Sequence, residues 1–196
     1  MTGRRTSLLS LIVALLLGQA SAAFAGGPDM APINAMDRAA FVEKFGGIFE
    51  NSPWVAEQAW ESRPFASLDA MHAAMAGVAK NAPAPLQLAL LQAHPDLAGK
   101  EAQAGAMTAS SVAEQASAGL SALSKDEMAE ISALNAAYRK KFGFPFIIAV
   151  RMHTKEGIFF EFRRRLHNDT QTEFANDLQN VTIITRLRLI KLLEAS

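Results

Sequence analysis

His94 is the residue of this chain best suited to acid–base chemistry near neutral pH. It lies in the run Ala93-His94-Pro95-Asp96-Leu97, and an unperturbed histidine has a pKa of about 6.5. Because a proline restricts the residue before it to extended geometry, we expect His94 to stand where a helix ends. Two interpretations stay open: the ring faces a pocket and donates a proton, or it only interacts with the C-terminal end of the helix dipole.

A second polar group follows in the run Ser111-Val112-Ala113-Glu114-Gln115. Ser111 and Glu114 have the spacing of a capping box, which predicts that both lie in the first turn of a helix. The free amides of such a turn, together with the positive end of the helix dipole, could bind an anionic ligand. The spacing alone leaves open whether Glu114 takes part in chemistry or only caps the helix.

Two later stretches could complete a binding site. The apolar residues 146–150 follow Gly143 and Pro145, which are typical of a helix end, and their backbone amides could line a pocket. On the last expected helix, a rotation of about 100° per residue places Arg188 on the apolar face with Phe174, Val181 and Leu192, whereas Arg186 points away. An arginine directed inwards needs an anionic partner, which is either a carboxylate of the protein or a ligand.

The composition argues against several other kinds of site. The chain has no cysteine, so disulfides, thiol chemistry and cysteine-based metal sites are excluded. The other histidines, His72, His153 and His167, have no metal-ligand spacing with one another or with His94, and we therefore expect no metal. The 19 basic and 19 acidic residues balance, which argues against a nucleic-acid partner.

Helical periodicity and helix-capping signals predict a single compact all-α domain over residues 37–196, with about eight helices. The expected helices cover residues 37–46, 53–62, 67–80, 84–94, 111–121, 124–141, 155–167 and 170–194. Ser124 with Glu127 and Thr170 with Glu173 have capping-box spacing. Residues 144–150 are ambiguous between an extended link and the start of a buried helix.

The first 25 residues have the features of a secretory signal peptide. Arg4 and Arg5 precede an apolar run over residues 8–17, and Ala23-Phe24-Ala25 resembles a cleavage site. The arginine pair also admits a twin-arginine signal. The apolar run is too short to span a bilayer, and no later stretch is long and apolar enough. We expect a loose leader at residues 26–36 and a mature protein in the bacterial periplasm or outside the cell, without a membrane anchor.

Taken in order, the motifs of this chain resemble those of the 2-oxo-4-hydroxy-4-carboxy-5-ureidoimidazoline (OHCU) decarboxylase family. The resemblance extends from about residue 37 to residue 193. The matching runs are Ser52-Pro53-Trp54-Val55-Ala56-Glu57, Arg63-Pro64-Phe65, His94-Pro95-Asp96-Leu97-Ala98-Gly99-Lys100, residues 111–115, Leu134-Asn135 with Tyr138, residues 142–150, and Arg165-Leu166 with Asn168. The implied fold is all-α, and the implied reaction is the cofactor-free decarboxylation that gives (S)-allantoin at the end of urate degradation.

The resemblance also implies roles for individual residues. His94 corresponds to the family's proton donor, Glu114 to its essential glutamate and Arg188 to an arginine of the final helix, so these three are the expected catalytic residues. We expect Glu114 to keep His94 protonated, while Arg188 and nearby amides bind polar groups of the substrate. The expected substrate-binding residues are Pro95, Ser111, Val112, Ala113, Glu114, Gln115, Phe146, Ile147, Ile148, Ala149 and Val150.

The expected partners follow from the same resemblance. The chain would act on a small ureidoimidazoline as a homodimer, with no cofactor or metal. Since this substrate is short-lived in water, we expect a urate oxidase and a hydroxyisourate hydrolase in the same compartment. Two alternatives stay open: an inactive periplasmic helical binding protein of the same family, or a decarboxylase or hydrolase of another ureido or hydantoin acid.

Overall fold

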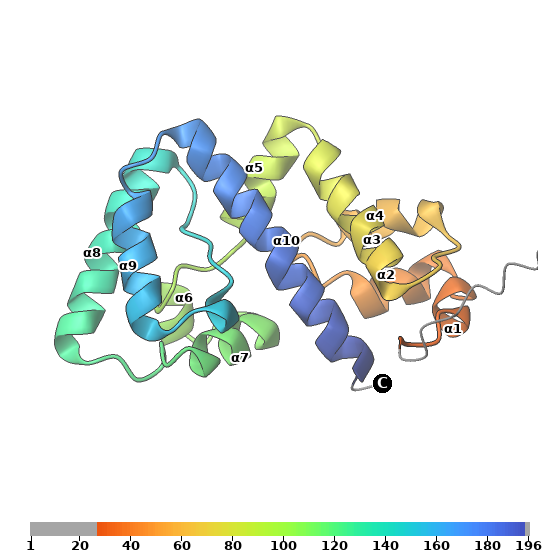
Figure 1. Ribbon diagram of the computed structural model, residues 1–196, viewed down its shortest axis with the longest axis horizontal. Helices are drawn as coiled ribbons and strands as arrows, with labels where there is room; N and C mark the ends of the chain where they lie inside the picture. Colours follow the sequence, from red (N-terminus) through yellow and green to blue (C-terminus); the bar gives the residue numbers. More distant parts are fainter. Residues whose placement is uncertain (1–26, 195–196) are drawn as a thin grey trace, which may run out of the picture.

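The computed structural model describes residues 27–194, and within this range every regular element is a helix (Figure 1). The all-α prediction is therefore confirmed. The predicted signal peptide, residues 1–25, lies outside the described residues. No helix of the described range has the length and apolar character needed to cross a membrane.

The described residues form ten α-helices and two 3₁₀ helices. In chain order these are α1 (Ala31–Asn34), α2 (Arg38–Phe45), α3 (Trp54–Ala59), η1 (Trp60–Ser62), α4 (Leu68–Asn81), α5 (Ala84–Gln92), α6 (Lys100–Gln103), α7 (Ala109–Ser117), α8 (Lys125–Phe142), η2 (Val150–Met152), α9 (Lys155–Arg165) and α10 (Thr170–Glu194). All eight predicted helices are present. The short elements α1, α6 and η2 were not predicted, because one turn of helix carries too little periodicity to detect.

Several helix ends follow the predicted capping chemistry. Ser124 and Glu127 form the predicted capping box at the start of α8. Gly143 ends α8 in the left-handed conformation with φ of 84°, which a residue without a β-carbon adopts at no steric cost. Residues 145–149, in the ambiguous stretch beyond it, belong to neither a helix nor a strand.

The capping box predicted at Thr170 and Glu173 is wrong. Asp169 fills the capping position instead, because its carboxylate accepts a hydrogen bond of 2.8 Å from the Thr172 amide. Glu173 is fully buried and pairs with Arg165 at 2.9 Å. Glu173 therefore binds the buried Arg165 and does not cap the helix.

Residues 30–36 also differ from the loose leader expected from their sequence. Ile33 is buried, and the Asn34 side chain forms hydrogen bonds of 2.8 and 2.9 Å with the backbone of Phe65. These contacts fix α1 to the segment between η1 and α4. The folded part of the chain thus begins before residue 37.

The long helix α10 runs diagonally across the middle of the molecule, between the end that holds α8 and α9 and the end that holds α2, α3 and α4 (Figure 1). It packs on α4 and α5 and, near its start, on α8. At one end of the molecule, α2 and the segment around Phe65 bury Phe41 and Phe45; at the other, α8 and α9 close over Tyr138 and Phe162. Helix α10 contributes Ile184 and Arg188 to the lining of the pocket described next.

Candidate active site

A small pocket collects most of the residues that the sequence singled out. It is lined by His94, Pro95, Leu97, Ser111, Glu114, Gln115, Phe146, Ile147, Ile148, Val150, Ile184 and Arg188. The cavity between these side chains has a volume of about 40 Å³, well below the roughly 300–1,000 Å³ typical of ligand pockets. The walls come from the segment after α5, from α7, from residues 146–150 and from α10. Four segments distant in the sequence thus place His94, Glu114 and Arg188 around one small cavity.

His94 lies just beyond the end of α5, as its proline neighbour predicts. Its Nδ1 atom is 2.9 Å from the carbonyl oxygen of Leu90, which can only accept, so Nδ1 carries a proton. Nε2 is buried and has no hydrogen-bond partner among the described residues. Burial lowers the pKa of His94, and this outweighs the opposing attraction of Glu50. With its pKa lowered, the ring is neutral at pH 7 and Nε2 carries a lone pair.

The loop after His94 is held by Gln115 of α7. The Gln115 side chain accepts a hydrogen bond of 2.8 Å from the amide of Ala98, which has φ of 48°. A non-glycine residue rarely adopts that conformation, so the hydrogen bond has to stabilise it. From the other side, Asn135 of α8 donates to the carbonyl of Leu97 at 2.9 Å. These two amide side chains fix the loop that begins with His94 and Pro95.

Glu114 is not a helix cap, and the capping box predicted with Ser111 is wrong. Helix α7 begins two residues earlier than predicted, and Thr108 caps it by accepting from the Ser111 amide. Ser111 and Glu114 therefore lie inside the helix, on its buried face. The Ser111 amide is already bound by Thr108, so it is not the free anion-binding donor expected from the sequence.

Arg188 points into the protein, as the helical spacing predicts, and Arg186 points outwards to Asp69. Nε and Nη2 of Arg188 donate to the two carboxylate oxygens of Glu114, both at 2.8 Å. This two-point pairing fixes the plane of the carboxylate. Glu114 thus forms its ion pair with Arg188 and not with His94, on which its charge has only a small effect.

A second buried carboxylate, Glu50, was missed from the sequence. It lies in the turn between α2 and α3, and its carboxylate is 2.7 Å from Nη1 of Arg188. It also accepts from the hydroxyl groups of Thr108 and Ser111, at 2.8 and 3.0 Å. Burial alone would raise the pKa of Glu50, but the charge of Arg188 and the hydrogen bonds from Arg188 and Thr108 together outweigh it, and the pKa is lowered. Glu50 is therefore ionised at neutral pH.

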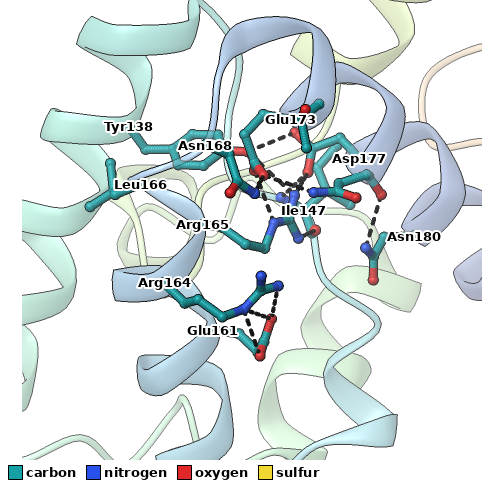
Figure 2. A network of polar contacts seen from close by, with 12 residues as sticks. Tyr138, Ile147, Glu161, Arg164, Arg165, Leu166, Asn168, Glu173, Asp177 and Asn180 are labelled. Atoms are coloured by element: carbon teal, nitrogen blue, oxygen red, sulfur yellow. Dashed lines mark hydrogen bonds and ion pairs between the residues drawn. The ribbon is translucent and has the colours of Figure 1, made fainter.

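Residues 146–150 are tied to α10 by a buried polar network (Figure 2). Asp177 accepts from the Ile147 amide and Asn180 from the Ala149 amide, both at 3.0 Å. Arg165 donates to the Ile147 carbonyl at 2.9 Å and pairs with Asp177 at 2.6 Å. Amides that alternate with these, at residues 148 and 150, have no acceptor among the described residues. They are the ones left for a ligand.

Three of the expected substrate-binding residues do not line the pocket in the described part of the chain. Val112 lies on the outer face of α7 and is 46% exposed. Ala113 is half-buried, and the amide of Ala149 is bound by Asn180. In α7, the helix period turns Val112 and Ala113 away from the face that carries Ser111 and Glu114. Ala149 lies between Ile148 and Val150, which do line the pocket.

Comparison with known proteins places the chain in one family. A family model described as OHCU decarboxylase matches residues 34–190. A relative from Haloferax volcanii named 2-oxo-4-hydroxy-4-carboxy-5-ureidoimidazoline decarboxylase is 44% identical over 157 residues, which cover 80% of this chain and 91% of the relative. A relative of the same name from Mus musculus is 39% identical over 167 residues, which cover 85% of this chain and 94% of the relative.

Two solved structures share the fold. A crystal structure described as (S)-allantoin synthase has a TM-score of 0.66 and 27% identity, covering 84% of this chain and 53% of that chain. An OHCU decarboxylase crystallised in the presence of (S)-allantoin has a TM-score of 0.63 and 23% identity, covering 77% and 98%. The family model alone spans well over half of the chain. This chain therefore belongs to the OHCU decarboxylase family.

Proposed function

We propose that this chain decarboxylates 2-oxo-4-hydroxy-4-carboxy-5-ureidoimidazoline to (S)-allantoin in urate degradation, with His94 as the proton donor. The observation that carries the proposal is the Nε2 atom of His94, which is buried at the wall of the pocket and has no hydrogen-bond partner within residues 27–194. Buried polar atoms are normally hydrogen-bonded, so a ligand is the natural partner for this one. The names of the relatives supply the substrate class.

The pocket offers distinct partners to the two ends of a ureidoimidazoline. The carboxylate of Glu114 can accept hydrogen bonds from ureido or hydroxyl groups. The unpaired amides of Ile148 and Val150 can donate to oxygen atoms of the substrate, where negative charge develops as the reaction proceeds. Since these groups are fixed by Arg188 and by the Arg165–Asp177 network, they need little rearrangement when the substrate binds.

His94 becomes protonated when the substrate binds. A carboxylate that enters the pocket adds a negative charge near the ring, and an opposite charge at short range raises the pKa of a histidine. Loss of CO₂ then leaves an electron pair delocalised over the adjacent C=N bond of the ring. Transfer of the Nε2 proton to the carbon that bears the ureido group, while the hydroxyl proton passes to the former imine nitrogen of the ring, gives the carbonyl of allantoin and returns His94 to its neutral form. Delivery from one face gives one allantoin enantiomer, and the reaction needs no external electron sink.

A coupled assay tests the activity and separates it from the two alternatives. Urate oxidase and hydroxyisourate hydrolase generate the substrate from urate, the mature protein is added, and circular dichroism follows allantoin. We expect faster formation of (S)-allantoin than without protein. A rate and handedness equal to the uncatalysed reaction would exclude the decarboxylase. If the substrate then still raised the melting temperature, the chain would be a binding protein; if it did not, other ureido and hydantoin acids become the candidates.

We also propose that the chain is exported, cleaved after Ala25 and assembled as a homodimer. The arginine pair, the apolar run and the alanine pair before residue 26 support export. Mass spectrometry of the protein from a periplasmic fraction should give an N-terminus at residue 26, and an N-terminus before residue 20 would contradict cleavage there. Light scattering of the mature protein should give twice the mass of one chain. Export predicts that the enzymes supplying the substrate occupy the same compartment.

A further inference from the structure

Every N–H group of Arg188 is used within the protein. Nε donates to Glu114, Nη2 donates to Glu114 and to the Ser111 hydroxyl at 3.0 Å, and Nη1 donates to Glu50. The fifth contact is a longer one, 3.4 Å from Nη1 to the carbonyl of Ile48. A guanidinium has five N–H groups, so a ligand could bind Arg188 directly only by displacing one of these partners. In this arrangement Arg188 orients groups that face the ligand.

Glu50 is the part of this arrangement that joins separate elements. Its carboxylate contacts Arg188 of α10, the Thr108 hydroxyl that caps α7, and the Ser111 hydroxyl inside α7. Glu50 is 3% exposed, and its backbone φ of 48° lies in a region that residues other than glycine rarely adopt. The contacts of the carboxylate hold this unfavourable backbone conformation. Glu50 therefore fixes the position of α7 against α10 beside the pocket.

The charges around His94 make Glu50 more than a structural link. The charged groups that act on the ring are Glu50 from the turn after α2, Glu114 from α7 and Arg188 from α10. Two carboxylates face one guanidinium, so this cluster is net negative while His94 is neutral. A net negative cluster favours a positive charge on the nearby imidazole ring.

We propose that Glu50 is a positioning residue of the decarboxylation: it holds Arg188 and Ser111 in place and supplies the negative charge with which His94 takes up its proton. Glu50 lies behind the pocket, and the neighbouring cavity that it lines contains the basic residues Lys44, Arg151 and Lys191. It acts on the substrate through Arg188, Ser111 and His94. The kinetic part of this proposal rests on the proposed function, whereas the effect on His94 does not.

The test compares Glu50→Gln, which removes the charge, with Glu50→Asp, which keeps the charge but shortens the side chain. Titration of ¹⁵N-labelled histidines by NMR, without substrate, should show the pKa of His94 lower by roughly one unit in Glu50→Gln. In Glu50→Asp it should stay near the wild-type value. The kcat should fall roughly 100-fold in both variants, because the groups that orient the reaction are displaced, with a smaller change in KM. Glu130→Gln, in an exposed ion pair with Arg163, is the control and should change neither.

Each result decides a separate part of the proposal. An unchanged His94 pKa in Glu50→Gln would overturn the electrostatic role, and a wild-type kcat in Glu50→Asp would overturn the positioning role. If Glu50→Gln does not fold, the kcat of Glu50→Asp still decides the positioning role, and a His94 pKa lowered by about one unit in Glu50→Asp would overturn the electrostatic role, because that variant retains the charge. If the wild-type protein has no decarboxylase activity, the proposed function fails while the His94 titration remains a valid test of the charge effect.

Discussion

Replacement of Arg188 by methionine should destabilise the protein in a way that depends on pH. Methionine fills much of the same volume, but it leaves the buried carboxylates of Glu50 and Glu114 without their cation. Removing one partner of a buried ion pair typically costs about 3–5 kcal/mol. The protein can limit this cost by binding a proton. At pH 7, protonating a carboxyl with an ordinary pKa of 4.5 costs about 3.4 kcal/mol, at 1.36 kcal/mol per pH unit.

The same reasoning gives the sign of the pH dependence. In the wild type the pKa of Glu50 is lowered on folding, so its contribution to stability is present above pH 4.5 and is lost as the pH falls through the folded value. In the Arg188→Met variant, burial without a cation raises the pKa of Glu50 above the unfolded value. The contribution of Glu50 to stability is then fully present below pH 4.5 and is lost as the pH rises through the pKa of the folded variant. The difference between the two proteins should be about 3–4 kcal/mol at pH 7 and only about 1 kcal/mol at pH 5.

Urea unfolding at pH 5 and pH 7 measures this difference directly. Arg186→Met is the matched control, since Arg186 lies on the same helix and its side chain is 48% exposed in a surface pair with Asp69. It should change the free energy of unfolding by less than about 0.5 kcal/mol at either pH. A loss for Arg188→Met that is below about 1 kcal/mol at pH 7, or equal at both pH values, would refute the view that Arg188 compensates two buried carboxylates.

Three further substitutions test the groups that surround the pocket. His94→Gln should fold normally yet lower kcat at least about 100-fold in the allantoin assay, since the proton donor is lost; near-wild-type turnover would remove His94 from this role. Asn180→Leu leaves the Ala149 amide without its acceptor, so urea unfolding should show a loss of about 1–3 kcal/mol and kinetics a raised KM; an unchanged KM would separate this contact from binding. Gln115→Leu frees the Ala98 amide, and kcat should fall with little change in secondary structure by circular dichroism, whereas retained kcat would show that the loop holds its shape without Gln115.

The sequence predicts the features of this site that depend on one local rule. The direction of Arg188 follows from the helix period, because a long helix keeps its register from Thr170 to Glu194. The place of His94 follows from the conformational restriction imposed by Pro95. Each prediction needed only residues of the same element, and each is confirmed.

The missed features depend on competition between distant residues. The spacing of Ser111 and Glu114 is the same whether they cap a helix or lie inside it, and Thr108 with Arg188 decided the outcome. Thr170 and Glu173 failed as a capping box for the same reason, with Asp169 as the competing cap. Glu50 lies in a turn, where no periodicity marks a residue as buried, and its partners come from α7 and α10. Tertiary contacts of this kind leave no local pattern.

The number of residues between Asp177 and Arg188 in α10 fixes the distance between two walls of the pocket. Asp177 binds the amide of Ile147, and Arg188 binds the carboxylate of Glu114. Asp177 and Arg188 lie on one buried face of α10. Their separation is close to three helical turns, or roughly 16 Å along the axis. One inserted residue between them would turn Arg188 by about 100° and shift it by about 1.5 Å. Working members of the family should therefore differ by substitution within this stretch of α10, and vary in length elsewhere.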